Sequence, residues 1–197
     1  MRIAVIGTGK VGRGFAAALA PHHEVIIGSR DPDRRRKAVR ATGAVDVVPP
    51  AEAVEGAEVV ILAVPWRAME ETLARLGDLE GTVAVDVSVP YGKEREALGP
   101  RSSGEFVQKR LPRARVVKGW NHVFARYLTA PEVDGIASSV LLAGDEPEAK
   151  RIVSGLARDM GFHPVDVGSL RESYHLDRLV SMMLFVKLGP FRVLGKP

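Results

Sequence analysis

The chain contains no cysteine, and this absence removes several kinds of chemistry at once. Disulfides, thiolate nucleophiles and cysteine–zinc sites are all excluded. Long hydrophobic runs are absent too, since the longest, residues 179–186, contains a serine and falls far short of a membrane span. The first apolar segment begins at residue 2, which leaves no room for a signal peptide before it. We therefore expect a cytoplasmic protein with no membrane part and no metal site.

Aromatic residues are scarce at 6%, and they do not alternate with the basic residues. The formal net charge of +4 therefore does not follow the pattern of a nucleic-acid-binding surface. Phosphate binding is a simpler explanation for a run of four basic residues, 34–37. Amides are scarcer still, because Asn121 is the only asparagine and Gln108 the only glutamine. We expect no nucleic-acid partner, and we expect Asn121 to have a specific role.

Residues 7–14 read Gly-Thr-Gly-Lys-Val-Gly-Arg-Gly, preceded by an apolar run and followed by apolar residues at helical spacing. A glycine turn between a strand and a helix binds a pyrophosphate at the helix N-terminus. Gly7 permits the tight turn, Gly9 lets the backbone approach the phosphates, and Gly12 lets the helix pack on the strand. The pattern predicts a dinucleotide site, and the alternative is a turn that serves packing alone.

Ser29 and Arg30 follow the second expected strand, where the adenine ribose of a bound dinucleotide must lie. An acidic residue at this place usually binds the ribose 2′-hydroxyl of NAD. Here a hydroxyl and a guanidinium suit a 2′-phosphate instead, and Asp31 comes only after the arginine. The sequence therefore favours NADP over NAD, with Arg34 as the expected third phosphate ligand. The alternative is a polar loop followed by a solvated basic helix face.

Strands and helices alternate along the whole chain, which predicts a Rossmann-type α/β fold with a doubly wound, mainly parallel sheet. We expect one domain of 197 residues, with a dinucleotide core at about 1–125 and a small C-terminal α/β extension at about 126–197. Strands are expected at residues 2–7, 25–27, 57–64, 82–87, 115–118, 139–144 and 164–167. Helices are expected after the glycine turn and at 68–76, 105–111, 147–160 and 169–188, with a loop at 91–104.

Three strand ends carry similar residues, and the carboxyl ends of neighbouring parallel strands meet at one edge of a sheet. Proline turns the chain out of the sheet there, which leaves backbone to flank a flat ring. The expected ring-binding residues at these ends are Val64, Pro65, Trp66, Val89, Pro90 and Asn121. The side-chain amide of Asn121 offers both donors and an acceptor to a carboxamide or a ring edge. The alternative is that each proline only terminates its strand.

His122 is the only histidine expected near this cleft. As a general acid it could protonate an alkoxide or a ring nitrogen. A histidine whose ring nitrogens are bound to backbone carbonyls is the structural alternative, and the two interpretations make different predictions for a substitution.

The glycine turn, Gly28-Ser29-Arg30, Val64-Pro65-Trp66 and the segment 166–170, Asp-Val-Gly-Ser-Leu, together resemble the F420-dependent NADP oxidoreductase family. The segment 117–121, Val-Lys-Gly-Trp-Asn, is similar to the NADPH-oxidoreductase domain of the STEAP metalloreductases. The resemblance covers nearly the whole chain and implies hydride transfer between NADP(H) and a deazaflavin (F420) or a flavin such as FMN or FAD. Such a transfer needs orientation of two rings rather than an acid–base constellation, because the cofactors carry the chemistry.

The resemblance also implies roles for individual residues. Thr8, Gly9, Lys10 and Val11 would contact the pyrophosphate, whereas Ser29, Arg30 and Arg34 would hold the 2′-phosphate. Val64, Pro65, Val89 and Ala125 would lie along the nicotinamide. Members of the family are implied to be homodimers.

The last expected helix is apolar on most faces toward its C-terminal end, which suggests burial against a second copy or against the flavin site. The alternative is packing on its own sheet alone, and the sequence favours the dimer. Two other functions stay open from the sequence. One is an NADP(H)-binding sensor module without catalysis. The other is a reductase of a small carbonyl or imine substrate, with His122 as the proton donor.

Overall fold

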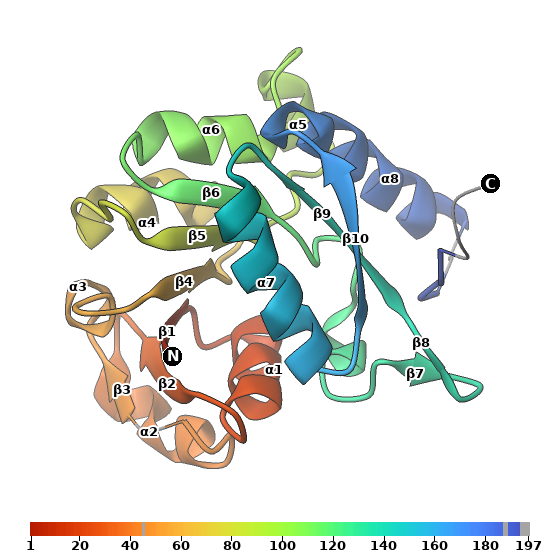
Figure 1. The fold of residues 1–197 in the computed structure, drawn as a ribbon. Helices are drawn as coiled ribbons and strands as arrows, with labels where there is room; N and C mark the ends of the chain where they lie inside the picture. Colours follow the sequence, from red (N-terminus) through yellow and green to blue (C-terminus); the bar gives the residue numbers. More distant parts are fainter. Residues whose placement is uncertain (45, 187–188, 194–197) are drawn as a thin grey trace.

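Eight strands form one sheet in the part of the chain that the structure describes, which is residues 1–44, 46–186 and 189–193 of a computed structural model. The order across the sheet is β10-β9-β6-β5-β4-β1-β2-β3 (Figure 1). The strands are β1 Arg2–Ile6, β2 Glu24–Gly28, β3 Asp46–Val48, β4 Val59–Leu62, β5 Val83–Asp86, β6 Arg115–Lys118, β9 Ser139–Gly144 and β10 His163–Gly168. From β3 to β6 all pairs are parallel, in the order that dinucleotide-binding folds use. The predicted Rossmann-type fold is confirmed.

Helices cover both faces of this sheet. They are α1 Lys10–Leu19, α2 Pro32–Arg40, α3 Pro50–Ala53, α4 Met69–Leu76, α5 Lys93–Ala97, α6 Ser103–Arg110, α7 Pro147–Asp159 and α8 Ser173–Val186. Short 3₁₀ turns lie at Trp66–Ala68, Ala125–Tyr127 and Leu170–Glu172. Helices α1, α2 and α7 contribute to one core and α3, α4 and α6 to the other, while α8 packs on β9 and β10 beside α6 (Figure 1).

Successive side chains of a buried strand point to opposite faces of the sheet, so each strand contributes to both cores. In β1, Ile3 and Val5 belong to the core under α1, while Ala4 and Ile6 belong to the core under α4. A strand covered on both faces needs apolar residues at every position, which explains the continuous apolar runs in the sequence. Because the strands are packed on both faces, their ends have fixed positions in the sheet. The residues that follow these ends are therefore held in place by the sheet.

The C-terminal part of the sheet runs in the opposite direction. Strand β9 pairs antiparallel with β6, and β10 pairs parallel with β9. The last two residues of β9 pair with Val117 and Lys118 at the carboxyl end of β6. The beginning of β9 therefore extends past β6, and Ser139 lies beside His122.

Several elements differ from the sequence expectation. Strand β3, helix α5 inside the expected loop, and a hairpin of β7 Glu132–Val133 and β8 Ile136–Ala137 were not predicted. The helix expected at 169–188 begins as a 3₁₀ turn and becomes α8 only at Ser173. Its last two expected residues lie outside the described part of the chain.

Among the described residues, no helix is both long enough and apolar enough to cross a membrane. The same residues contain no group of three or more histidine, aspartate or glutamate side chains placed to hold a metal ion.

Candidate functional site

The glycine turn joins β1 to α1, and the structure shows why its glycines are needed. Gly7 has φ +122°, and a Cβ there would lie 2.3 Å from the Ala63 carbonyl oxygen. A Cβ on Gly12 would lie 1.9 Å from the carbonyl oxygen of Gly7. At Gly9, by contrast, a Cβ would meet nothing within 4 Å. The open space at Gly9 is therefore free for a ligand, while Gly7 and Gly12 hold the turn against the sheet.

Helix α1 begins at this open position. No side chain of the described residues caps it at Gly9, so its first N–H groups face the space above the turn. Unpaired N–H groups at a helix N-terminus bind anions well. Thr8, Lys10 and Val11 complete the turn, and the Arg13 guanidinium donates to the Thr8 carbonyl oxygen at 3.0 Å. The geometry fits a pyrophosphate.

A cavity of about 530 Å³ opens beside the turn, and we call it the glycine-turn cavity. Its walls come from the turn, the end of β2, the start of α2 and one face of α4. The lining residues are Ile6, Gly7, Thr8, Gly9, Gly28, Ser29, Arg30, Asp31, Arg34, Arg35, Pro50, Ala63, Val64, Pro65, Ala68, Glu71, Thr72 and Arg75. The cavity thus brings Ser29, Arg30 and Arg34, the predicted phosphate ligands, together with the glycine turn.

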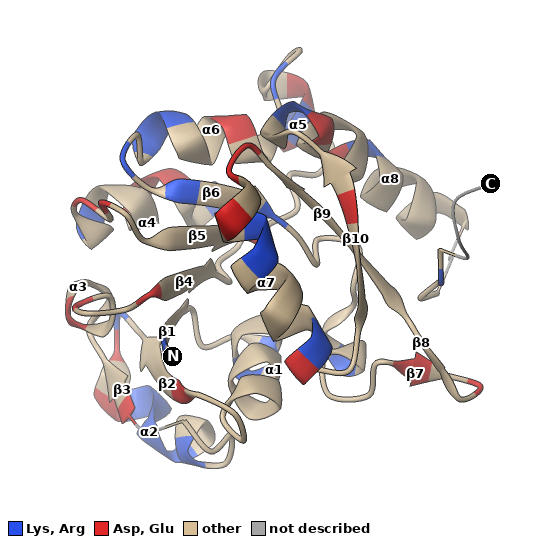
Figure 2. Ribbon diagram, in the orientation of Figure 1, with Lys and Arg blue, Asp and Glu red and all other residues tan. Residues whose placement is uncertain are grey.

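Four arginines line this cavity against two carboxylates, which makes it basic. Figure 2 shows the basic residues gathered on α2. Asp31 is occupied as the N-cap of α2, where its carboxylate accepts from the Arg34 backbone N–H at 3.3 Å. Glu71 is paired with Arg75 at 2.7 Å. The remaining positive charge suits an anion with several oxygens, such as a phosphate monoester.

Arg35 and Arg75 are cavity residues that sequence reasoning did not assign. Arg35 lies in a basic run that gave no means of telling its members apart. Arg75 comes from α4, 45 positions after Arg30, and only the fold brings the two together. In contrast, Arg36 of the same run is paired with Asp33 and Asp46 and does not line the cavity.

A second cavity of about 390 Å³ lies at the carboxyl ends of β4 and β5, and we call it the strand-end cavity. It is lined by Gly9, Lys10, Val11, Ala63, Val64, Pro65, Trp66, Arg67, Val87, Ser88, Val89 and Glu94. Both cavities share Gly9, Ala63, Val64 and Pro65, so they adjoin across the glycine turn. The Trp66 ring is fixed against Phe106, with centroids 5.1 Å apart and the planes at 63°.

The third predicted strand end is more deeply buried. Asn121 is 5% exposed and His122 4%, and neither lines the two cavities; the same holds for Pro90, Ala125 and Gly12. Trp120 adopts φ +53°, so the chain turns sharply before the asparagine. The geometry therefore places two of the three predicted strand ends in one cavity and leaves the third outside both cavities.

His122 is held between the sheet and the C-terminal segment. Its Nε2 lies 3.2 Å from the Ser139 carbonyl oxygen, and its ring lies 5.4 Å from that of Phe191. Burial lowers its pKa from 6.5 to about 4, against the opposing effect of the Ser139 carbonyl. The ring is neutral at pH 7, which favours the structural interpretation of His122 over a role as proton donor.

Asn121 contacts this neutral ring. Its side-chain amide lies next to Nδ1 of His122, with Oδ1 at 3.4 Å. Because Nε2–H donates to Ser139, Nδ1 is an acceptor, and the amide satisfies it best when turned so that its NH₂ faces the ring. In either orientation one polar atom of the buried amide has no partner among the described residues. A buried polar atom without a partner makes Asn121 a candidate for a ligand contact, although it lines neither cavity in this arrangement.

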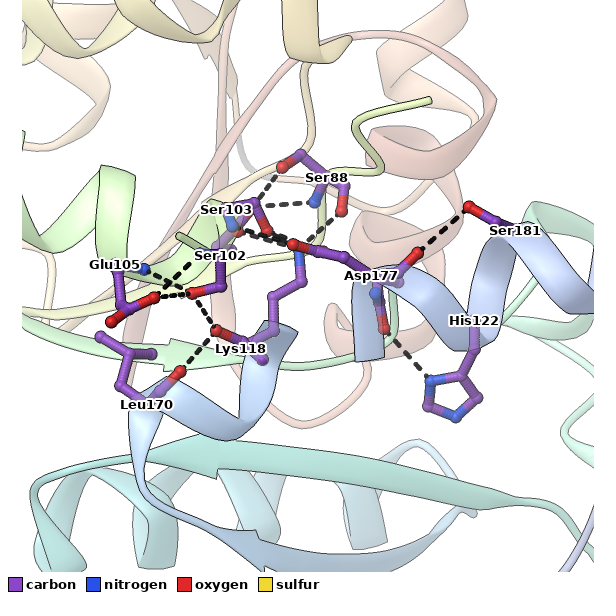
Figure 3. Close-up of polar contacts among 12 residues, drawn as sticks. Ser88, Ser102, Ser103, Glu105, Lys118, His122, Leu170, Asp177 and Ser181 are labelled. Carbon is purple, nitrogen blue, oxygen red and sulfur yellow. Dashed lines mark hydrogen bonds and ion pairs between the residues drawn. The ribbon is translucent and has the colours of Figure 1, made fainter. Parts of the chain in front are cut away.

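Behind the strand-end cavity lies a buried ionic network that the sequence did not reveal (Figure 3). Lys118 at the end of β6 and Asp86 at the end of β5 form an ion pair at 2.9 Å, and Asp177 of α8 lies 3.4 Å from the same ammonium. All three side chains are fully buried. Asp177 also accepts from the backbone N–H of Ser103 at the start of α6, at 2.8 Å.

Comparison with known proteins agrees with this architecture. The model of the family described as NADP oxidoreductase, coenzyme F420-dependent, matches residues 2–90. The dinucleotide-binding part of the chain, residues 2–90, belongs to this family. The F420-dependent NADP reductase of Methanocaldococcus jannaschii is 28% identical over 205 residues, which are 93% of this chain and 91% of that protein. A solved structure of a candidate F420-dependent NADP reductase from Arthrobacter sp. FB24 superposes with a TM-score of 0.86 at 28% identity, over 99% of this chain and 100% of the other.

A second group of relatives is longer than this chain. Rat metalloreductase STEAP3 is 36% identical over 185 residues, which are 93% of this chain but only 37% of the metalloreductase. The chain therefore corresponds to little more than a third of that relative's length.

Proposed function

We propose that this member of the NADP oxidoreductase family transfers hydride between NADP(H) and a deazaflavin or flavin. The observation that carries the proposal is the pair of adjoining cavities on either side of the glycine turn. One is basic and lined by Ser29, Arg30 and Arg34, and the other lies at the strand ends with Val64, Pro65 and Val89. A dinucleotide is an elongated ligand with a phosphorylated adenosine at one end and a flat ring at the other.

In this arrangement the residues of the turn would bind the pyrophosphate through backbone N–H groups. Ser29, Arg30 and Arg34 would bind the 2′-phosphate, and Arg35 is a further candidate. Val64, Pro65, Trp66 and Val89 would flank the nicotinamide. Pro90 and Ala125 line neither cavity and stay candidates from the sequence alone. The unsatisfied amide of Asn121 would bind the carboxamide or the edge of the second ring. When bound, NADPH supplies the hydride, and the protein supplies the orientation of the rings.

Two features support this function over a carbonyl or imine reductase that uses His122 as acid. The ring of His122 is buried, and its pKa of about 4 makes it a poor proton donor at neutral pH. Hydride transfer between stacked rings needs no such donor. The names of the relatives from Methanocaldococcus jannaschii and rat support F420 and a metalloreductase-type acceptor respectively, so both acceptor classes belong in the test.

The test is stopped-flow oxidation of NADPH with F420, FMN and FAD as acceptors, followed at the NADPH absorbance. We expect turnover with at least one of them, and a weaker reaction with NADH. Tight NADPH binding with no turnover on any acceptor would instead favour the sensor module.

We further propose that the protein is a homodimer through α8. The end of this helix exposes Met182 (52%), Leu184 (40%), Phe185 (88%) and Val186 (56%). Exposed apolar side chains gathered on one helix end are typical of an interface. Sedimentation at micromolar concentration should give twice the chain mass of 21.3 kDa, and Phe185→Asp should shift it to the monomer. A wild-type protein that sediments as a monomer would contradict the proposal.

A further inference from the structure

The buried network at the ends of β5 and β6 contains charges that the proposed chemistry does not yet use (Figure 3). The Lys118 ammonium donates to Asp86 Oδ2 at 2.9 Å, to the Ser88 carbonyl oxygen at 2.6 Å and to Ser103 Oγ at 2.7 Å. These three hydrogen bonds use all three protons of the ammonium. Asp177 Oδ1 lies 3.4 Å from the same nitrogen.

Every carboxylate oxygen in this network accepts and none needs to donate. Asp86 Oδ1 accepts from the backbone N–H of Ser88 at 2.9 Å and from its hydroxyl at 2.5 Å. Asp177 accepts from the N–H and the hydroxyl of Ser103, both at 2.8 Å. Acceptor-only oxygens are those of ionised carboxylates. One ammonium and two carboxylates leave the network with a net charge of −1, fully shielded from water.

Ser88 connects this charge to the proposed nicotinamide site. Its backbone and hydroxyl are bound by Asp86 and Lys118, and it also lines the strand-end cavity. The network therefore lies directly behind the cavity wall. Charges in the protein interior act over longer distances than charges in water, because the effective dielectric constant is lower.

We infer that the buried negative charge of Asp86, Asp177 and Lys118 favours bound NADP⁺ over bound NADPH, and so shifts hydride transfer within the complex toward the oxidised nicotinamide. This inference rests on the proposed function and adds a selectivity for the oxidation state of the bound nucleotide. Hydride leaves C4 of the dihydronicotinamide with both electrons of its C–H bond, and the ring becomes cationic. The deazaflavin or flavin receives the hydride, is reduced, and takes up a proton from water. A fixed negative charge stabilises the positive charge that develops on the nicotinamide.

The arginines of the glycine-turn cavity attract the phosphates equally in NADP⁺ and NADPH, so this attraction cancels in the ratio of the two affinities. Lys10, Arg67 and Glu94 line the strand-end cavity and also act on the ring. The ratio of the two dissociation constants, Kd(NADP⁺) to Kd(NADPH), therefore reports the total field at the ring, and its change on substitution isolates the part that comes from the network.

The experiment measures both dissociation constants by calorimetry for the wild type, Asp177→Asn and Ser103→Ala. Asp177→Asn keeps the side-chain shape and removes one negative charge, so the ratio should rise by about tenfold. Ser103→Ala removes the hydroxyl that joins Lys118 to Asp177 and leaves the net charge unchanged. The ratio should stay within about twofold of the wild type for this control. Circular dichroism confirms that each variant is folded.

Equal changes of the ratio in the two variants, or no change in Asp177→Asn, would overturn the inference. If Asp177→Asn does not fold, Asp86→Asn is measured in its place, and the same rise of the ratio is expected. Absence of binding of either nucleotide would instead refute the proposed function, so the two failures are distinguishable.

Discussion

The two halves of the candidate site use charged side chains in opposite ways. In the glycine-turn cavity Arg30, Arg34 and Arg35 are exposed. Behind the strand-end cavity Lys118 and Asp86 are completely buried, and nearly every polar atom has a partner inside the protein. One set of charges is open to a ligand, while the other is closed within the fold.

This difference separates side chains that bind the ligand from side chains that stabilise the fold around the site. Exposed arginines lose little solvation free energy when they bind a phosphate. They therefore contribute to the free energy of nucleotide binding and not to that of folding. Buried ions must be compensated before any ligand arrives, because an unpaired charge in the interior is strongly destabilising. Substitutions in the first region should therefore change the affinity for both oxidation states of the nucleotide. Substitutions in the second should change the stability of the free protein and the ratio of the affinities for NADP⁺ and NADPH.

Lys118→Met is expected to have the largest effect, since it leaves two buried carboxylates without their cation. The free energy of unfolding should fall by about 3–5 kcal/mol. Urea denaturation followed by circular dichroism measures it. The control is Lys150→Met, which removes a pair with half-exposed Asp166 and should cost about 1 kcal/mol. Similar losses in both variants would remove the distinction between the buried network and an ordinary ion pair.

Gly12→Ala tests the rigid base of the glycine turn. The added Cβ would lie 1.9 Å from the Gly7 carbonyl oxygen, so helix α1 must move away from β1. We expect a loss of about 3 kcal/mol in stability and a loss of NADPH binding. The same substitution at Gly155, inside α7 with nothing within 4 Å, should stabilise the protein by about 1 kcal/mol. Thermal melting of both variants decides the question, and a harmless Gly12→Ala would refute the packing argument.

Arg30→Ala should weaken NADPH binding by about 2 kcal/mol, because a charged phosphate contact is lost. NADH binding and the stability of the free protein should change little. Dissociation constants for both nucleotides, measured by fluorescence titration, check this. Arg36→Ala is the matched control from the same basic run, since Arg36 is paired with Asp33 and Asp46 outside the cavity. Equal losses for NADPH and NADH would show that Arg30 is not a ligand of the 2′-phosphate.

His122 should make the stability of the buried half depend on pH. Its pKa is 6.5 in the unfolded chain and about 4 in the folded protein, so protonation favours unfolding as the pH falls from 6.5 toward 4. At pH 5 this costs about 2 kcal/mol that is absent at pH 8. Urea titrations at both pH values should show a smaller pH dependence in His122→Gln. Exposed His175 is the control, and His175→Gln should leave the pH dependence unchanged.

Much of the nucleotide half was predictable from local patterns. The glycine turn, Ser29-Arg30 and the apolar strands each carry their information in a few consecutive residues, and the structure brings them together as expected. Strand β3 was missed because its three residues, Asp46–Val48, are too short for a periodic signal. Helix α5 was missed because its five residues are mostly charged and lie in a segment that looks like a loop.

The buried network could not be predicted from the sequence. Lys118 and Asp86 lie at the ends of apolar strands, where polar residues normally meet solvent, and Asp177 lies on a helix 59 positions after Lys118. Only the tertiary fold shows that all three carry no exposed surface. Likewise, no pattern indicated that His122 lies under Phe191, because that contact depends on the path of the C-terminal segment.

The antiparallel direction of β9 has a consequence for where in the sequence the parts of the site come from. His122, which contacts Asn121, is held by Ser139 at the start of β9, and Phe191 covers it from near the end of the chain. The described residues that line the glycine-turn cavity, in contrast, all lie within the first 75 positions. The surroundings of Asn121 therefore join segments from distant parts of the sequence, whereas the phosphate side of the site comes from one continuous stretch of it.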